Sequence, residues 1–216
     1  MKQGLTELVF VIDRSGSMHG LERDTIGGLN ATLDENRALP GEAIVSLVLF
    51  NNSSQVMLDR VPLEEVAPLT ERDYRVGGCT ALLDAVGDAV RYHAKVQQIL
   101  PEEHRAEHVV FVVITDGLEN ASTHRTYREV KELVSRQTEL GWQFLFLGAN
   151  IDAAAEAENI GIARDHAAQY VSDSQGSAAA YASVARAQCE TRVAGAPSAG
   201  WSESAQSDWK ARRHRR

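Results

Sequence analysis

The chain has 216 residues, 44% of them hydrophobic, and a formal net charge of -8. This length suits one large globular domain, and a compact fold of this size buries roughly 70% of the surface that the unfolded chain exposes. The acidic balance argues against nucleic acid and anionic membranes as default partners. The two cysteines, Cys79 and Cys189, lie far apart in the sequence. They form no metal-ligand spacing and favour a reducing compartment without disulfides.

The first half of the chain is predicted to form a strand, a helix and a hairpin. Residues 8–12 are a continuous apolar run rich in β-branched side chains, which is typical of a strand covered on both faces. Residues 21–38 carry apolar side chains at helical spacing. The polar residues 51–54 separate two extended segments, 43–50 and 55–61, so we expect the second segment to be an antiparallel edge strand.

The second half of the chain alternates between helical and strand-like patterns. Helical spacing covers residues 81–100, 126–140 and 176–193, and apolar strand-like runs cover residues 109–114, 144–147 and 169–171. Alternation of this kind predicts an α/β fold with a layered sheet.

The two ends of the chain carry no sign of targeting or membrane insertion. No apolar run approaches the ~20 residues that span a bilayer, and no secretory signal is visible, so we expect a cytoplasmic protein with no membrane partner. Residues 195–207 are rich in Gly, Ser and Ala, and residues 210–216 are basic. We therefore expect a domain over residues 1–194 and a flexible tail over residues 195–216. The basic end is the one weak exception to the argument against polyanions.

Carboxylate and hydroxyl side chains occur where three of the predicted elements meet loops. They are Asp13, Ser15 and Ser17 after the first strand, Thr80 at the start of the second helix, and Asp116 after the strand at 109–114. In open α/β sheets, ligands collect at the carboxyl ends of the strands, so a common edge is expected. Each motif alone also suits an ordinary turn or a helix N-cap. Together they form a set of hard oxygen donors, which favours Mg²⁺ or Mn²⁺, with Ca²⁺ a weaker candidate and zinc disfavoured.

The pattern Asp13-x-Ser15-x-Ser17, followed by Thr80 and Asp116, resembles the metal-ion-dependent adhesion site (MIDAS) of the von Willebrand factor A domain family. The resemblance covers roughly residues 5–190. It implies a Rossmann-like, doubly wound, mostly parallel sheet with one antiparallel edge strand. It also implies that the three hydroxyls bind the metal and that the two aspartates bind directly or through water. A cysteine directly before Thr80 departs mildly from the family pattern without removing a ligand.

A site of this kind favours protein binding over catalysis. Two carboxylates, partly held a water away, and three neutral hydroxyls leave a divalent ion electrophilic, with one position open to solvent. An Asp or Glu side chain of a partner protein is expected to replace the water there. We therefore expect a non-enzymatic, metal-dependent protein–protein interaction module without catalytic residues.

Two other functions are compatible with the same residues. A metal-dependent phosphoester hydrolase could use Asp13 and Asp116, but no phosphate-binding glycine loop is present, and His19 is the only candidate base. Alternatively, the metal could be structural or absent, without a role in partner binding.

Several polar and aromatic residues are expected to have ordinary structural roles. His93, His104 and His108 match no standard zinc spacing, so solvated or capping roles are expected for them. Glu119 and Asn120 would either line the rim of the metal site or form a plain polar loop. The predicted tail contains Trp201 and Trp209, which could dock on a partner or on the domain itself.

Overall fold

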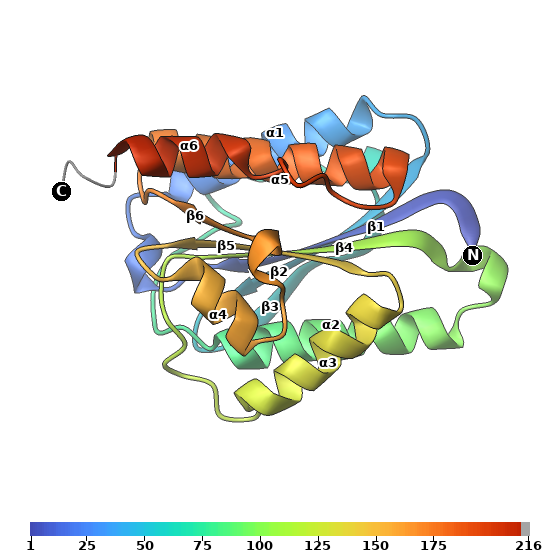
Figure 1. Cartoon of the computed structure of the whole chain (residues 1–216), viewed down its shortest axis with the longest axis horizontal. Helices are drawn as coiled ribbons and strands as arrows, with labels where there is room; N and C mark the ends of the chain where they lie inside the picture. The colour runs from blue at the N-terminus through green and yellow to red at the C-terminus, as the bar shows by residue number, and fades with distance from the viewer. Residues whose placement is uncertain (213–216) are drawn as a thin grey trace.

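A six-stranded sheet forms the centre of the computed structural model, in which residues 1–212 are described (Figure 1). The strands are β1 (Lys2–Asp13), β2 (Glu42–Phe50), β3 (Ser54–Pro62), β4 (Ala106–Thr115), β5 (Gln143–Ala149) and β6 (Ala167–Tyr170). Their order is β3-β2-β1-β4-β5-β6. Only the β2–β3 pair is antiparallel, and it places β3 at the edge, as the turn at 51–54 predicts.

Helices cover both faces of the sheet (Figure 1). One face carries α1 (Glu22–Arg37), α5 (Ser174–Ala194) and α6 (Glu203–Arg212), and the other carries α2 (Leu82–Ile99), α3 (Tyr127–Glu139) and α4 (Ala153–Asn159). This arrangement confirms the predicted α/β, Rossmann-like, doubly wound fold. Within residues 1–212, no helix combines the length and the apolar character that crossing a bilayer requires.

The core consists of two apolar layers that share the central strands. In β1, Leu8 and Phe10 pack in the layer beneath α1 and α5, whereas Val9 and Val11 pack in the layer beneath α2 and α3. All four side chains are fully buried. Coverage on both faces explains why the strands appear in the sequence as continuous apolar runs instead of alternating patterns.

The prediction of a flexible tail is wrong for residues 201–212. Trp201 is only 1% exposed, and its indole Nε1 donates a hydrogen bond to the Asp165 carbonyl, 2.9 Å away. The helix that follows, α6, packs against α5 and β6. At its end, Arg212 Nη1 donates to the Asp173 carboxylate at 2.6 Å. A buried tryptophan and an ion pair therefore fix a segment whose small residues resemble a linker. The end of the basic cluster, residues 213–216, lies outside the described residues.

Candidate metal centre

The two aspartates come together because β1 and β4 are parallel neighbours. Asp13 is the last residue of β1, and Asp116 directly follows β4, so both lie at the carboxyl edge of the sheet. Asp13 is fully buried and Asp116 is 4% exposed. The last residue of β4, Thr115, donates its hydroxyl to Asp13 Oδ2 at 2.7 Å. The ends of the two central strands are thereby tied together.

The loop after β1 curls so that alternate residues converge, as the sequence predicts. The Ser15 amide donates to Asp13 Oδ1 at 2.6 Å, and the hydroxyls of Ser15 and Ser17 lie 2.9 Å apart. A carboxylate that accepts the amide two residues later is typical of an Asx turn. Ser15 is buried, whereas Ser17 is exposed. One hydroxyl of the loop therefore lies inside the site and the other at its mouth.

The third loop brings Thr80 to the same place. A Cβ atom built on Gly117, the residue after Asp116, would lie 3.2 Å from Thr80 Oγ1 and 3.4 Å from Ser17 Oγ. The Thr80 hydroxyl does not cap a helix, because the N-cap position of α2 is Ala81 and carries no side-chain bond. The structure thus brings all five predicted residues to one point, and the alternative N-cap role of Thr80 is not observed.

Within residues 1–212, the site holds negative charge for which no ion-pair partner is seen. Asp116 Oδ1 is buried and has no hydrogen-bond partner. Burial raises the pKa of Asp116 above its usual value, against an opposing hydrogen bond from Ser17. Burial likewise raises the pKa of Asp13; hydrogen bonds from Thr115 and Ser15 oppose this rise, and the nearby charge of Asp116 adds to it. A divalent cation would neutralise both carboxylates and satisfy the unpartnered oxygen, so the donor set fits a hard metal ion.

The chain is similar to known proteins in its three-dimensional structure. No family model matches the chain, and no curated protein matches it in sequence. Among solved structures, proximal thread matrix protein 1 from the mussel byssus, with a zinc-occupied MIDAS motif, matches with a TM-score of 0.59 and 17% identity. That match covers 87% of this chain and 46% of the mussel chain.

A von Willebrand factor type A structure from Catenulispora acidiphila matches with a TM-score of 0.59 and 15% identity, over 87% of this chain and 43% of the other. The chain has the von Willebrand factor A fold. A manganese-loaded Plasmodium vivax TRAP protein also matches, with a TM-score of 0.55 and 15% identity, over 79% of this chain and 70% of that one. This chain spans less than half the length of the mussel and Catenulispora chains, and identities this low show the fold alone.

Two asparagines that the sequence presents only as turn residues support the Thr80 loop of this von Willebrand factor A fold. Asn51 Nδ2 donates to the Gly77 carbonyl at 2.7 Å, and the Cys79 amide donates to Asn52 Oδ1 at 2.9 Å. Between them, Gly78 has a φ of +86°, and a Cβ there would lie 2.1 Å from Asn52 Oδ1. Only glycine therefore fits this position. The Asn-Asn pair was the available sequence signal, but side-chain bonds to a distant loop cannot be inferred from it.

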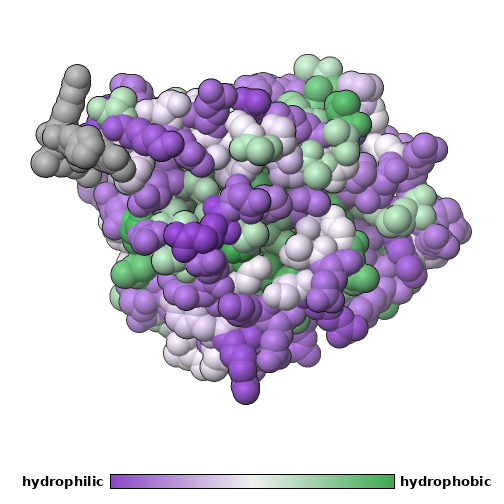
Figure 2. All heavy atoms as spheres, in the orientation of Figure 1, coloured by the Kyte–Doolittle hydropathy of each residue, from purple (hydrophilic) through white to green (hydrophobic). Residues whose placement is uncertain are grey.

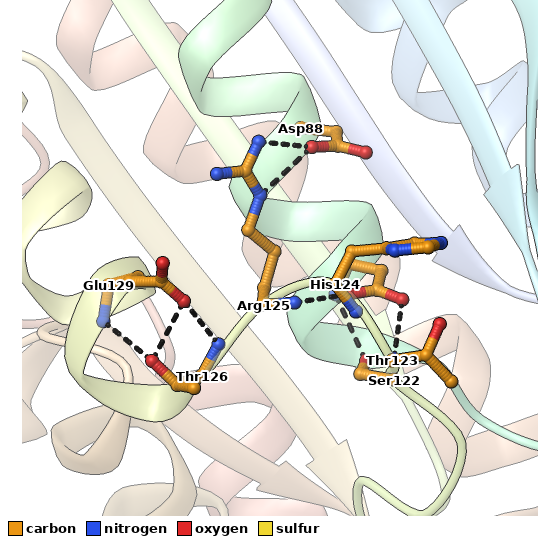
Figure 3. A network of polar contacts seen from close by, with 8 residues as sticks. Asp88, Ser122, Thr123, His124, Arg125, Thr126 and Glu129 are labelled. Atoms are coloured by element: carbon orange, nitrogen blue, oxygen red, sulfur yellow. Dashed lines mark hydrogen bonds and ion pairs between the residues drawn. The ribbon is translucent and has the colours of Figure 1, made fainter.

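The loop after Asp116 is fastened to α2 by carboxylates. Glu119 accepts hydrogen bonds from the amide of Leu83 at 2.9 Å and from the amides of Ala121 and Ser122 at 2.8 and 2.7 Å. Farther along the loop, Arg125 contacts Asp88, and Thr126 forms a capping box with Glu129 at the start of α3 (Figure 3). Of the two roles expected for Glu119, the structural loop role is the one observed.

The histidine prediction is wrong for His93. This side chain is 2% exposed, and its Nδ1 lies 2.6 Å from Oε1 of the fully buried Glu7 in β1. Arg60 forms a second ion pair with the same carboxylate. The prediction failed because the partners come from separate strands and a helix, so that burial is decided by tertiary packing. The cluster lies within the sheet–helix interface and not in the metal site.

Proposed function

We propose that this chain is a metal-dependent protein-binding module. In this proposal Asp13, Ser15, Ser17, Thr80 and Asp116 hold Mg²⁺ or Mn²⁺, and a partner protein contributes an Asp or Glu side chain to the remaining position. The observation that carries the proposal is the convergence of the Ser17 and Thr80 hydroxyls beside Asp116, whose buried Oδ1 has no partner. Within residues 1–212, no cluster of three or more His, Cys, Asp or Glu side chains could hold a metal, so the hydroxyls are essential to the set.

The structural relatives support a divalent metal without deciding which one. The mussel protein carries zinc in its MIDAS motif, and the Plasmodium protein carries manganese. We favour Mg²⁺ or Mn²⁺ for this chain because all its donors are hard oxygens and none is a thiolate or imidazole.

Cys79 and Cys189 are both free thiols, which supports a reducing, cytoplasmic location.

The geometry supports binding over hydrolysis. Both carboxylate oxygens of Asp13 already accept hydrogen bonds and the side chain is fully buried, which is unfavourable for a nucleophile. The candidate base, His19, has an 86% exposed side chain, and its Nδ1 lies 3.3 Å from Glu22. A screen of phosphoesters with Mg²⁺ or Mn²⁺ tests the alternative directly. Turnover that disappears in Asp13→Asn would favour the hydrolase instead.

The proposal is tested by titrating the purified chain with Mn²⁺ and following free metal by electron paramagnetic resonance. We expect Asp13→Ala and Asp116→Ala to lose binding, whereas Asp165→Ala, a change on the exposed surface, should bind as the wild type does. Wild-type affinity in both site variants would overturn the metal assignment.

Partner binding needs a second experiment. A pull-down run with Mg²⁺ and repeated with chelator should retain the partner only in the first case. A partner retained equally in both would show that any metal is structural.

A further inference from the structure

Asn120 makes two hydrogen bonds to the backbone of Thr80. The side-chain Oδ1 of Asn120 accepts the backbone amide of Thr80 at 2.8 Å. The backbone amide of Asn120 donates to the Thr80 carbonyl at 3.0 Å. Bonds on both sides of one residue fix the direction of its side chain, because the two peptide groups that flank the Cα are both held. Thr80 is thereby attached to the loop that begins at Asp116.

The loop that carries Asn120 is itself held rigidly. Asp84 in the first turn of α2 accepts the amides of three consecutive loop residues, Thr123, His124 and Arg125, at 2.9, 3.0 and 2.8 Å. Figure 3 shows the three loop residues together with the ion pair between Arg125 and Asp88. Glu119 fixes the same loop one residue before Asn120. Asn120 therefore transmits the position of a well-anchored loop to Thr80.

The orientation of Thr80 has no evident structural use. Its hydroxyl caps no helix. That hydroxyl instead points to Gly117, where a built Cβ would lie 3.2 Å from Oγ1. Asn120 is itself exposed, so its side chain fills no part of the core. Asn120 accepts one hydrogen bond from buried Thr80 through its side chain and donates one to it through its backbone amide, and this pairing is best explained if the threonine oxygen must occupy a fixed place.

We propose that Asn120 is a positioning residue of the metal centre, which holds Thr80 Oγ1 in register with Asp116 without itself touching the metal. This inference rests on the proposed function. Partners that orient a metal ligand typically change metal affinity by 10–100-fold when they are removed. Since Thr80 supplies one neutral donor among five residues, we expect the lower end of that range.

The test measures Mn²⁺ affinity in Asn120→Ala, Asn120→Asp and Ser122→Ala. Asn120→Ala removes the acceptor for the Thr80 amide and should weaken Mn²⁺ binding about 10-fold. Asn120→Asp keeps an acceptor at that place and should retain most of the affinity. Ser122→Ala is the matched control: it removes a hydroxyl of the same loop that donates to Glu119 and accepts the backbone amide of Asp84, but it removes no hydrogen bond to Thr80, and it should change affinity little.

A double-mutant cycle with Thr80→Val decides whether Asn120 acts through the threonine hydroxyl. In the Thr80→Val background, Asn120→Ala should have no further effect on Mn²⁺ affinity. Unfolding curves in chelator show that each variant is folded. The inference is overturned if Asn120→Ala binds as the wild type does, if Ser122→Ala loses as much, or if the loss persists without the hydroxyl. A wild-type chain that binds no Mn²⁺ would instead refute the proposed function itself.

Discussion

Replacing Asp116 by Asn should stabilise the metal-free protein and destabilise the metal-bound one. Without metal, the Asp116 carboxylate is 4% exposed, and one of its oxygens has no partner. Burial raises its pKa, so the charged form is disfavoured in the fold. The amide removes the charge and its repulsion with Asp13, but it no longer provides a strong ligand for a cation.

The expected free energies predict that the difference in stability between the Asp116→Asn variant and the wild type changes sign when metal is added. A buried polar group without a partner costs about 1–3 kcal/mol, and because the amide remains polar we expect a gain of about 1 kcal/mol in chelator. Metal at 100 times its dissociation constant stabilises the wild type by about 2.7 kcal/mol and the variant by nearly nothing. For a chain of this size, 1 kcal/mol corresponds to roughly 2–4 °C in Tm. The variant should therefore melt a few degrees above the wild type in chelator and several degrees below it in saturating metal.

Thermal unfolding followed by circular dichroism, with chelator and with Mn²⁺, measures both differences. Asp165→Asn is the control: Asp165 is exposed, so this variant should melt as the wild type does in both buffers. A variant that is less stable than the wild type in chelator would show that the Asp116 charge is satisfied by the protein itself. An equal metal response in variant and wild type would show that the cation binds elsewhere.

Two further predictions concern stability away from the site. Glu7→Gln should cost about 3 kcal/mol in urea unfolding, because it leaves Arg60 without its buried counterion, whereas Glu42→Gln, on an exposed pair, should cost under ~1 kcal/mol. Burial tends to raise the pKa of Glu7, but His93 and Arg60 outweigh it and lower the pKa. This stabilisation is therefore present above about pH 4.5 and is lost as the pH falls below it. Glu7→Gln should therefore weaken the dependence of the free energy of unfolding on pH below that value, and an unchanged dependence would contradict this. Trp201→Ala should cost about 3–5 kcal/mol, far more than the same change at the less buried Trp209; equal costs would show that α6 is not anchored by Trp201.

The parts of the fold that the sequence predicts are those whose burial is uniform along an element. The strand at 8–12 is apolar throughout because both faces are covered, and the edge strand β3 follows from the polar turn before it. The helix α4 was not predicted, since its seven residues are too few to display a helical period. The polar N-terminal half of β1 and the helix α6 were missed because distant partners stabilise them: Glu7 with His93, and Trp201 with the Asp165 carbonyl.

The candidate site divides in the same way. The meeting of its five residues could be predicted because they follow strand ends or precede a helix, and parallel strands bring such points to one edge. The residues that hold them in place could not. Asn51, Asn52 and Asn120 act on backbone groups of other loops, and in the sequence they are indistinguishable from ordinary turn formers.

The hydrogen bonds that hold the site residues in place are unevenly distributed among them. This uneven distribution bears on the side from which a partner would approach. Asn120 holds Thr80, Asn52 in the β2–β3 turn accepts the amide of the preceding Cys79, and Thr115 at the end of β4 donates to Asp13. Ser17, by contrast, is exposed and bonded within the set only through Ser15 and Asp116. The exposed residues Gly16 and Gly78 lie beside it, their backbones joined at 2.9 Å, and neither places a side chain over the site. Since every other donor is buried, the carboxylate of a partner would have to reach the metal from the side of Ser17 and these two glycines. A bulky side chain at Gly16 should block the partner while leaving the metal bound, because a Cβ there would lie 3.4 Å from its nearest neighbour, the Gly78 carbonyl oxygen. Gly78 is unsuitable for this test, since only glycine fits its backbone conformation beside Asn52.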